Sequence, residues 1–292
     1  MMNRGLIRLF LWLYIAAFFA YLLGPLAVMG VTAFNASEYP QVYPFEGFTL
    51  KWFAALVGDD DIVYGLRNSL LIGVLVVALS VPVGLAGAIL MTQVYRRARA
   101  FYYLVVVSPV LTPGVIIGIS TVIFWREMTG LTGTRFLYNG MVLTVLSQAS
   151  FISAYTMLIF LARLQRFDRA QEEAALDLGA SHPQVFRHIL LPFLRPAILS
   201  ASVLAFLSSF ENYNTTTFAI LADKTLTTVL AGRVRQGTTP SISALAVLIV
   251  AVTLAGAITY ELVKRRSEAA LAARRKRAER EEDATLSHSA GA

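Results

Sequence analysis

Residues 173–192 read EAALDLGASHPQVFRHILLP and lie between two long stretches that are almost free of charge. These stretches are 136–162 and 196–222, and only Glu211 interrupts the second. Each is longer than the roughly 20 residues that cross a bilayer as a helix. A polar segment in this position predicts a membrane protein with a structured loop between two spans.

The rest of the chain repeats the apolar pattern. It is 57% hydrophobic and only 15% charged, whereas a soluble domain carries about 25% charged residues. Helices are expected because a helix pairs every backbone polar group within its own segment, and the alternating ten-residue segments of a membrane barrel are absent. The sequence therefore predicts an all-α membrane protein. The six expected transmembrane helices are 7–34, 68–94, 100–124, 141–163, 196–220 and 241–263.

Residues 1–263 are expected to form one transmembrane domain, with residues 164–195 as an inner loop and 264–292 as a charged tail. The tail either lies on the anionic inner leaflet or is a solvated extension. Within the outer loop 35–66, residues 50–53 (LKWF) indicate a short interfacial helix.

Two features mark the expected second and third helices. Asn68 and Ser69 are candidate caps at the start of the second helix. Pro109 and Pro113 predict a kink or break in the third, whose freed backbone groups must face protein or a water-filled cavity.

The distribution of charge predicts the orientation. With both termini in the cytoplasm, 18 of the 25 Lys and Arg residues fall on inner segments, as the positive-inside rule requires. This distribution fits a membrane protein better than a nucleic-acid-binding surface. The first apolar segment is much longer than the 7–15 residues of a signal peptide, so an uncleaved anchor is expected.

The segment 173–192 contains two helix patterns hinged at Gly179. Residues 171–178 are good helix formers that end at this glycine, and Ser181 with Pro183 can begin the next helix. The second helix is expected to stop at Pro192. It presents the apolar side chains Val185, Phe186, Ile189 and Leu190. Such an elbow suits a groove on a partner, although an ordinary amphipathic interfacial loop would share these properties.

The spacing within this segment is E-A-A, three residues, G, nine residues, I, one residue and L-P. It resembles the EAA motif of permease subunits of binding-protein-dependent ABC importers. The resemblance implies the type I importer (MetI-like) permease fold and a loop that couples to an ATPase subunit. The residues that match the motif are Glu173, Ala174, Ala175, Gly179, Ile189, Leu191 and Pro192.

The chain lacks the G-x-x-x-x-G-K-[S/T] phosphate loop, so ATP and Mg²⁺ are expected to bind a partner ATPase, and this chain needs no cofactor of its own. It also lacks cysteine, which excludes disulfides and thiolate metal sites, and we expect no metal site and no catalytic residue. The three histidines lie outside the expected spans, which argues against an intramembrane protease. A stand-alone channel or secondary transporter would explain the helices but not the EAA-like segment.

Further segments resemble the spermidine/putrescine permease branch, of the PotC type. They are Asn68-Ser69-Leu70, Ser108-Pro109 and residues 239–246. This resemblance implies a bacterial inner-membrane protein that works with an ATPase dimer, a second permease subunit and a periplasmic solute-binding protein. The second permease is either a different chain or a second copy. Polyamines are the leading substrates, and amino-acid-like compounds, aminophosphonates and ferric iron are alternatives.

The segment 210–218 departs from that branch, whose members commonly carry two adjacent aspartates where this chain has Glu211 and Asn212. We expect Glu211 near mid-membrane, where a charge costs about 2.5–3.5 kcal/mol and usually faces a cavity or a partner. Helical spacing would place Asn214, Thr215 and Phe218 on its face. The candidate pathway residues are Glu211, Asn212, Tyr213, Asn214 and Phe218. Alternatively, Glu211 makes a helix–helix hydrogen bond, pairs with a companion permease or acts as a gate.

Overall fold

A computed structural model describes residues 4–256, 258–259, 262 and 265. The chain divides into two compact units, one formed by residues 1–56 with 238–292 and the other by residues 57–237. Apart from Arg265, the predicted tail 264–292 lies outside the described residues, and its role stays a prediction.

The first unit contains long apolar helices and one ordered loop. Its helices are α1 (Arg4–Phe34), α2 (Lys51–Val57) and an apolar helix, Pro240–Gly256. Near the end of α1, the Thr32 hydroxyl donates a 2.9 Å hydrogen bond to Ser243 Oγ, and both side chains are buried. Helix α2 confirms the short helix predicted at residues 50–53.

A single asparagine organises the loop that follows α1. Asn35 Nδ2 donates to the backbone oxygens of Gln41 and Pro44, and Asn35 Oδ1 accepts from the backbone nitrogens of Ser37 and Glu46. The side chain is fully buried, so all of its hydrogen bonds are made within this loop. The loop is therefore ordered although it has no regular secondary structure.

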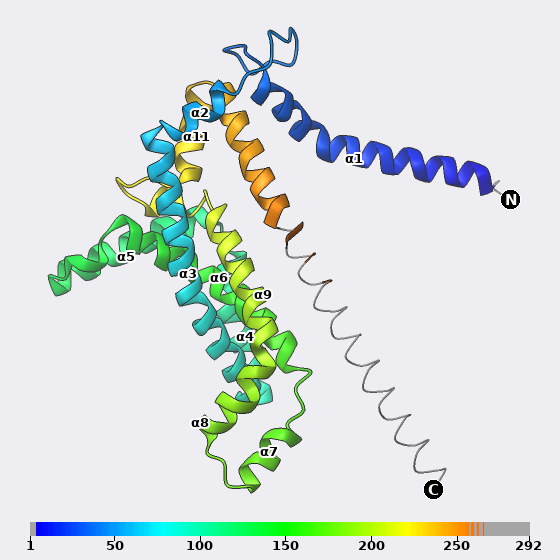
Figure 1. Cartoon of the computed structure of the whole chain (residues 1–292). Helices are drawn as coiled ribbons and strands as arrows, with labels where there is room; N and C mark the ends of the chain where they lie inside the picture. Colours follow the sequence, from blue (N-terminus) through cyan, green and yellow to red (C-terminus); the bar gives the residue numbers. More distant parts are fainter. Residues whose placement is uncertain (1–3, 257, 260–261, 263–264, 266–292) are drawn as a thin grey trace, which may run out of the picture. The chain divides into compact units, whose positions relative to one another are not determined.

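The second unit is built on three long helices that lie side by side (Figure 1): α3 (Asp60–Gln93), α6 (Gly140–Leu164) and α9 (Leu191–Phe210). Their core includes Ile72, Met157, Phe160 and Leu194, all fully buried or nearly so. Gly84 allows α3 to approach α6 closely, because a Cβ there would come within 2.8 Å of the Ser153 carbonyl oxygen.

Shorter elements surround these helices. They are α4 (Arg96–Leu111), α5 (Gly114–Thr132), the 3₁₀ turn η1 (Arg135–Leu137), α7 (Ala170–Asp177), α8 (His182–Val185), the π-helical turn η2 (Phe186–Leu190), α10 (Thr216–Ala219) and α11 (Leu226–Gln236). Helices α7 and α8 lie at one end of the unit and α11 lies at the other (Figure 1). Among the described residues, only an isolated Asn35–Phe48 bridge has β geometry.

Five described helices are long and apolar enough to cross a membrane, and a sixth, Pro240–Gly256, is apolar but shorter. The five are Gly5–Phe34, Asp60–Gln93, Gly114–Thr132, Gly140–Leu164 and His182–Phe210. The all-α membrane fold is thus confirmed, and each of the six predicted helices overlaps at least one observed helix. Three of the predicted boundaries require correction.

The second helix begins earlier than predicted. Asp59, not Asn68, is the N-cap of α3, and its side chain accepts a hydrogen bond from Ile62 N. Asn68 and Ser69 lie inside the helix and are buried. Asn68 Nδ2 donates to Lys224 O at 2.8 Å, and Ser69 Oγ accepts from Leu226 N at 2.9 Å. These two residues therefore tie α3 to the start of α11 instead of capping a helix.

The predicted third helix is two helices. Helix α4 ends at Leu111 and α5 begins at Gly114, with Pro113 at the break between them. A proline lacks the N–H that would continue the helical ladder, so the predicted kink or break is confirmed. Helix α5 then continues past Arg126 to Thr132, where Gly133 at φ +70° ends it.

The predicted helix 196–220 and the predicted stop at Pro192 are both wrong. One continuous helix, formed by α8, η2 and α9, runs from His182 to Phe210 and passes through Pro192. Leu191 N donates to Phe186 O across the π turn, one residue further back than in an α-helix. This wider turn gives room for the proline ring, which would otherwise clash with the preceding turn.

Candidate functional site

Residues 170–192, which we call the elbow, form a helix–glycine–helix turn at the end of the second unit. Helix α7 ends at Asp177, and Gly179 follows it with a left-handed φ of +86°. Gly179 N donates to Leu176 O and Ala180 N donates to Ala175 O, the two hydrogen bonds of a Schellman cap. The predicted role of Gly179 as a helix-ending residue is confirmed.

The second half of the elbow starts with a cap that the sequence also predicted. Ser181 precedes α8, and its backbone nitrogen donates to Gln184 Oε1 at 2.8 Å, as in a capping box. Pro183 lies in the first turn, where its missing N–H costs nothing. Each half of the elbow is therefore defined by contacts between neighbours in sequence.

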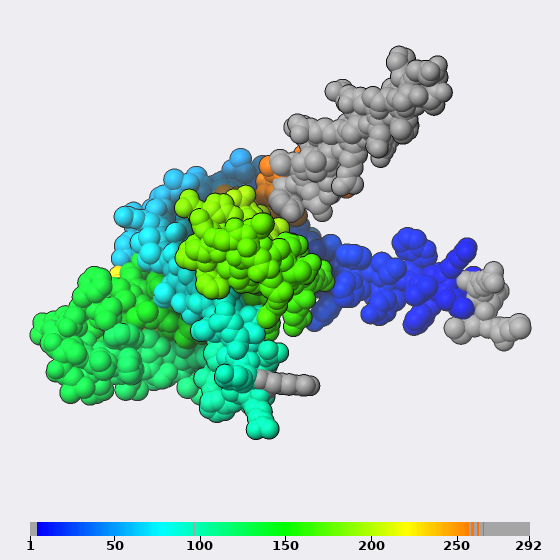
Figure 2. Space-filling view, turned by 90° about the horizontal axis from the view of Figure 1, so that it is seen from below, coloured from blue at the N-terminus to red at the C-terminus, as the bar shows by residue number. Residues whose placement is uncertain are grey.

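The seven EAA-motif residues all lie within the elbow, and none of them is buried. Glu173, Ala174 and Gly179 are exposed, and the remaining motif residues are half-buried: Ala175, Ile189, Leu191 and Pro192. Figure 2 shows this end of the molecule, with the elbow in lime green facing the viewer. Each motif residue therefore keeps some surface that another protein can reach.

Two apolar residues of the elbow differ from expectation. Val185 is only 4% exposed and packs inside the unit, so its prediction as a contact for a partner is wrong. Leu178 is 89% exposed and was not singled out from the sequence. Its position between the last residue of α7 and Gly179 was the available signal, because a side chain at a helix end beside glycine has few neighbours to cover it.

Arg163, near the end of α6, contacts Phe193, the residue that directly follows the elbow. Its Nε and Nη2 both donate to Phe193 O at 3.2 Å, and its guanidinium carbon lies 4.1 Å from the centre of the Phe193 ring. The Phe167 ring packs 5.1 Å from the same ring. We call these contacts of Arg163 and Phe167 with Phe193 the Arg163 clasp. They join α6 to the start of α9 by hydrogen bonds and a cation–π contact.

Glu211 lies at the other end of the continuous helix, as its C-cap, and is exposed. The helix ends there because Asn212 Oδ1 accepts hydrogen bonds from Thr215 N, Thr216 N and Thr216 Oγ1 at 3.1–3.2 Å. The prediction of Glu211 as a mid-helix residue is therefore wrong, and so is the helical face that it was to share with Asn214, Thr215 and Phe218.

A buried glutamine holds the chain after Glu211 against α6. Gln148 is 1% exposed, donates to Thr216 Oγ1 at 2.7 Å and accepts from the Ser209 hydroxyl. Because Thr216 also donates to Asn212, the hydrogen bonds form one chain from α9 through α6 to α10. Asn212 therefore has a structural role in addition to any contact with a solute.

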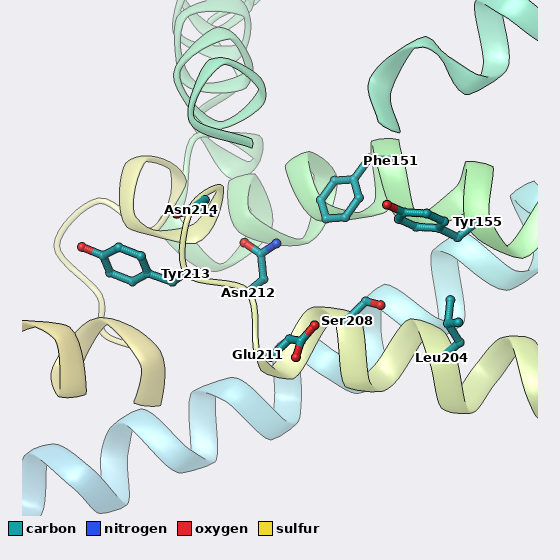
Figure 3. Close-up of a pocket in the computed structure, with 8 residues that line it drawn as sticks. All are labelled: Phe151, Tyr155, Leu204, Ser208, Glu211, Asn212, Tyr213 and Asn214. Atoms are coloured by element: carbon teal, nitrogen blue, oxygen red, sulfur yellow. The ribbon is translucent and has the colours of Figure 1, made fainter. Parts of the chain in front are cut away.

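Glu211 lines a hollow of about 340 Å³, shown in Figure 3, which we call the Glu211 hollow. The lining residues are Phe151, Tyr155, Leu204, Ser208, Glu211, Asn212, Tyr213 and Asn214. Four of the five predicted pathway residues are thus brought together. Phe218 does not line this hollow; it packs beside Gly118 of α5.

The carboxylate of Glu211 has no hydrogen-bond or ion-pair partner among the described residues. The nearby basic residue Arg235 donates instead to the Tyr213 hydroxyl, at 2.8 Å. Across the hollow, α6 supplies Phe151 and Tyr155, whose ring centres lie 6.3 Å apart (Figure 3). A free carboxylate opposite aromatic rings is a favourable site for an organic cation.

Sequence reasoning missed Phe151, Tyr155 and Ser208. The two aromatic residues are spaced by four in a long apolar segment, which places them on one helical face but does not show which helix that face meets. Phe210, which directly precedes Glu211, stacks on Phe206 and does not line the hollow.

Residues 80–268 match the family described as "Binding-protein-dependent transport system inner membrane component". The match includes both the elbow and the Glu211 hollow. The chain belongs to this family. It is therefore a multi-pass transport permease of the inner membrane, and the prediction of a transport protein in place of an intramembrane enzyme is confirmed.

The relatives of this permease agree with the branch that the sequence resembles. The putrescine transport system permease protein PotI of Escherichia coli (strain K12) is 30% identical over 251 residues, which cover 85% of this chain and 88% of the relative. The spermidine/putrescine transport system permease protein PotC of the same strain is 26% identical, with 86% and 92% covered.

Solved structures of similar fold confirm the permease architecture. A chain of a bacterial ABC transporter involved in the import of the acidic polysaccharide alginate is 20% identical and aligns with a TM-score of 0.66, covering 85% of this chain and 91% of that chain. A second structure of the alginate transporter, bound to its periplasmic protein, aligns with a TM-score of 0.64 at 19% identity, covering 85% and 90%. At these identities the likeness concerns the fold alone.

Proposed function

We propose that this permease forms half of the translocation pathway of an ATP-driven importer for small organic cations, with polyamines as the leading substrates. The observation that carries the proposal is the unpartnered Glu211 carboxylate in a hollow walled by Phe151 and Tyr155. A carboxylate without a partner attracts a cation, and an ammonium group can pair with it through charge-assisted hydrogen bonds. The names of the two polyamine permease relatives support the same substrate class.

The hollow favours one ammonium group at a time. Asn212 stands where the polyamine branch commonly has a second aspartate, and its side-chain oxygen is already used by Thr215 and Thr216. Among the described residues that line the hollow, only Glu211 therefore presents a negative charge. A polyamine would pass this point by exchanging successive ammonium groups on a single carboxylate, with the aromatic rings contacting its methylene segments.

The elbow is the proposed contact with a separate ATPase dimer, which would bind ATP and Mg²⁺. The helix His182–Phe210 runs without interruption from the elbow to Glu211. A displacement of the elbow would therefore reach the hollow along a stiff element, and the Arg163 clasp would carry it to α6. Such coupling requires contacts that differ between the two states of the transporter.

The remaining partners follow from the same proposal. A second permease subunit, either a different chain or a second copy, would complete the pathway, and a periplasmic binding protein would deliver the solute. The positive-inside distribution supports cytoplasmic termini and a cytoplasmic elbow.

Uptake by the assembled transporter in proteoliposomes tests the proposal. With labelled putrescine, we expect Glu211→Gln to reduce uptake about tenfold or more, since hydrogen bonds to charged groups contribute about 1.5–3 kcal/mol. Glu127→Gln is the matched control, because Glu127 is an exposed carboxylate on α5 outside the hollow. Unchanged uptake in Glu211→Gln would remove Glu211 from the substrate path.

Competition with unlabelled solutes tests the substrate class independently. Excess spermidine should abolish labelled putrescine uptake, whereas amino acids, aminophosphonates and ferric iron should not. Transport of one of these other solutes, without polyamine uptake, would retain the permease and replace its proposed substrate.

A further inference from the structure

A second hollow, of about 480 Å³, lies near the elbow end of the second unit, and we call it the basic hollow. Three helices that end or begin at the same level form its walls: α3, which ends at Gln93, α4, which begins at Arg96, and α6, which ends at Leu164. Two of these helices are membrane spans. The basic hollow therefore lies where the hydrocarbon region gives way to lipid headgroups.

Polarity changes in the same direction along all three walls. On α3 and α6, the lining residues Met91, Leu161 and Leu164 lie within the spans. On α4, Arg99 lies in the first turn and Tyr103 lies one turn deeper. Except for Phe167, which follows the end of α6, the apolar lining thus lies at the hydrocarbon level, and the charged lining lies at its border. A ligand that matches this hollow has an apolar part and an anionic head.

Two arginines supply the positive charge, and no described carboxylate neutralises either of them. Arg99 and Arg169 are exposed in the hollow, and neither forms an ion pair with a described residue. Arg169 Nη2 makes one long hydrogen bond, 3.5 Å, to Thr92 O. The neighbouring carboxylate of Asp168 accepts from Ala170 N at the start of α7 and does not line the hollow.

We propose that the basic hollow binds the phosphate headgroup of an anionic phospholipid. Arg99 and Arg169 would hold the phosphate oxygens, and the first part of an acyl chain would lie along Met91, Leu161 and Leu164. Guanidinium groups bind phosphate through paired hydrogen bonds, and basic pockets between transmembrane helices are suited to anionic headgroups. The site lies beside the elbow, since Arg169 immediately precedes α7, so a bound lipid would stabilise the position of that helix.

Lipid retention by the purified full-length chain tests this site without any transport assay. The chain is relipidated with defined mixtures of phosphatidylglycerol and phosphatidylcholine, and the retained lipid is measured by native mass spectrometry. We expect preferential retention of phosphatidylglycerol. The double variant Arg99→Gln/Arg169→Gln should reduce the preference for phosphatidylglycerol over phosphatidylcholine about 25-fold. This is about fivefold per arginine, which corresponds to about 1 kcal/mol for each basic residue near the surface.

Arg97→Gln is the matched control, because Arg97 belongs to the same basic run and is exposed but does not line the hollow. It should retain phosphatidylglycerol as the unchanged chain does. An equal loss in Arg97→Gln would show non-specific attraction to basic charge and overturn the site. Arg99→Lys/Arg169→Lys preserves the charge and should retain part of the preference, which separates loss of binding from a folding defect.

Two further outcomes distinguish other occupants. If millimolar inorganic phosphate displaces the retained lipid completely, the site recognises free phosphate and the lipid proposal fails. If Arg99→Gln/Arg169→Gln retains lipid but no longer binds purified ATPase in a separate titration, the hollow belongs to a protein interface and the lipid proposal fails. Neither result depends on polyamine uptake, so this proposal and the proposed substrate can fail separately.

Discussion

The elbow and the Glu211 hollow lie at opposite ends of one continuous helix, His182–Phe210, but they are held in different ways. The elbow is closed by hydrogen bonds between near neighbours, such as Ala180 N to Ala175 O. The hollow depends on Gln148, which joins Ser209 and Thr216 from a different helix. The comparison teaches that a short motif can specify its own shape, whereas the Glu211 hollow takes its shape from helices distant in sequence.

The largest expected effect tests the local character of the elbow. Gly179 has a φ of +86°, a left-handed conformation that costs a β-branched residue about 1–2 kcal/mol. This cost comes from the backbone alone, because no atom lies within 4 Å of a Cβ placed there. We expect Gly179→Val to abolish uptake in proteoliposomes while membrane insertion remains normal. Gly179→Asn should retain most of the uptake, because asparagine tolerates the left-handed conformation. Normal uptake in a well-expressed Gly179→Val protein would show that the shape of the elbow does not matter.

The next effect tests the long-range character of the hollow. Gln148→Leu preserves the volume but leaves the buried hydroxyls of Ser209 and Thr216 without this partner. A buried group left unsatisfied costs about 1–3 kcal/mol, so the melting temperature in detergent should fall clearly. Ser150→Ala is the control on the same helix, because Ser150 bonds only to the neighbouring Ser147 O. Equal melting temperatures for Gln148→Leu and the unchanged chain would contradict the proposed role of the network.

Leu178 allows the contacts of the elbow with a partner to be tested without changing the shape of the elbow, because its side chain is exposed. It is 89% exposed, and burying a leucine in an interface contributes about 1.5–3 kcal/mol. We expect Leu178→Ser to weaken ATPase association about tenfold, measured by titration of the purified ATPase against the permease in nanodiscs. Leu131→Ser is the control, since Leu131 is 82% exposed at the end of α5. If both variants bind the ATPase as the unchanged chain does, Leu178 lies outside the interface.

The smallest expected effect concerns a polar link between α3 and α11. Asp59 forms a 2.6 Å ion pair with Arg233. Burial alone would raise the pKa of Asp59, but the hydrogen bond from Arg233, the backbone N–H of Ile62 and the positive charge of Arg233 together lower it below its ordinary value. A lowered pKa stabilises the folded chain above the ordinary carboxylate pKa of about 3.9, and this stabilisation is lost as the pH falls through the folded value.

Arg233→Gln should therefore lower the melting temperature at pH 7 by an amount that corresponds to about 1 kcal/mol or less. The difference should shrink as the pH falls below the ordinary carboxylate pKa of about 3.9 and vanish once Asp59 is protonated in the folded chain. Arg235→Gln is the control, because Arg235 bonds to the neutral Tyr213 hydroxyl and should show no such dependence on pH. A difference for Arg233→Gln that persists at low pH would indicate packing in place of the ion pair.

The sequence by itself determined the all-α membrane fold, the break near Pro113 and the turn of the elbow at Gly179. These features depend on the length of apolar runs, on the missing N–H of proline and on caps within a few residues, all of which are local properties. The family followed from the spacing of the EAA-like motif for the same reason. The position of Glu211 was predicted wrongly because a continuous apolar pattern conceals a helix end that a single asparagine side chain creates.

Only the tertiary structure decided what surrounds each functional residue. It showed Asn68 and Ser69 as links between α3 and α11, Val185 as a core residue and Leu178 as an exposed one. It also brought Phe151 and Tyr155 to Glu211, and Arg99 to Arg169. Apolar membrane helices have several faces that could each pack against a neighbour, and hydrophobic periodicity does not distinguish among them. The choice is made by close approach at residues such as Gly84 and by buried hydrogen bonds such as those of Gln148, which depend on the packed helices.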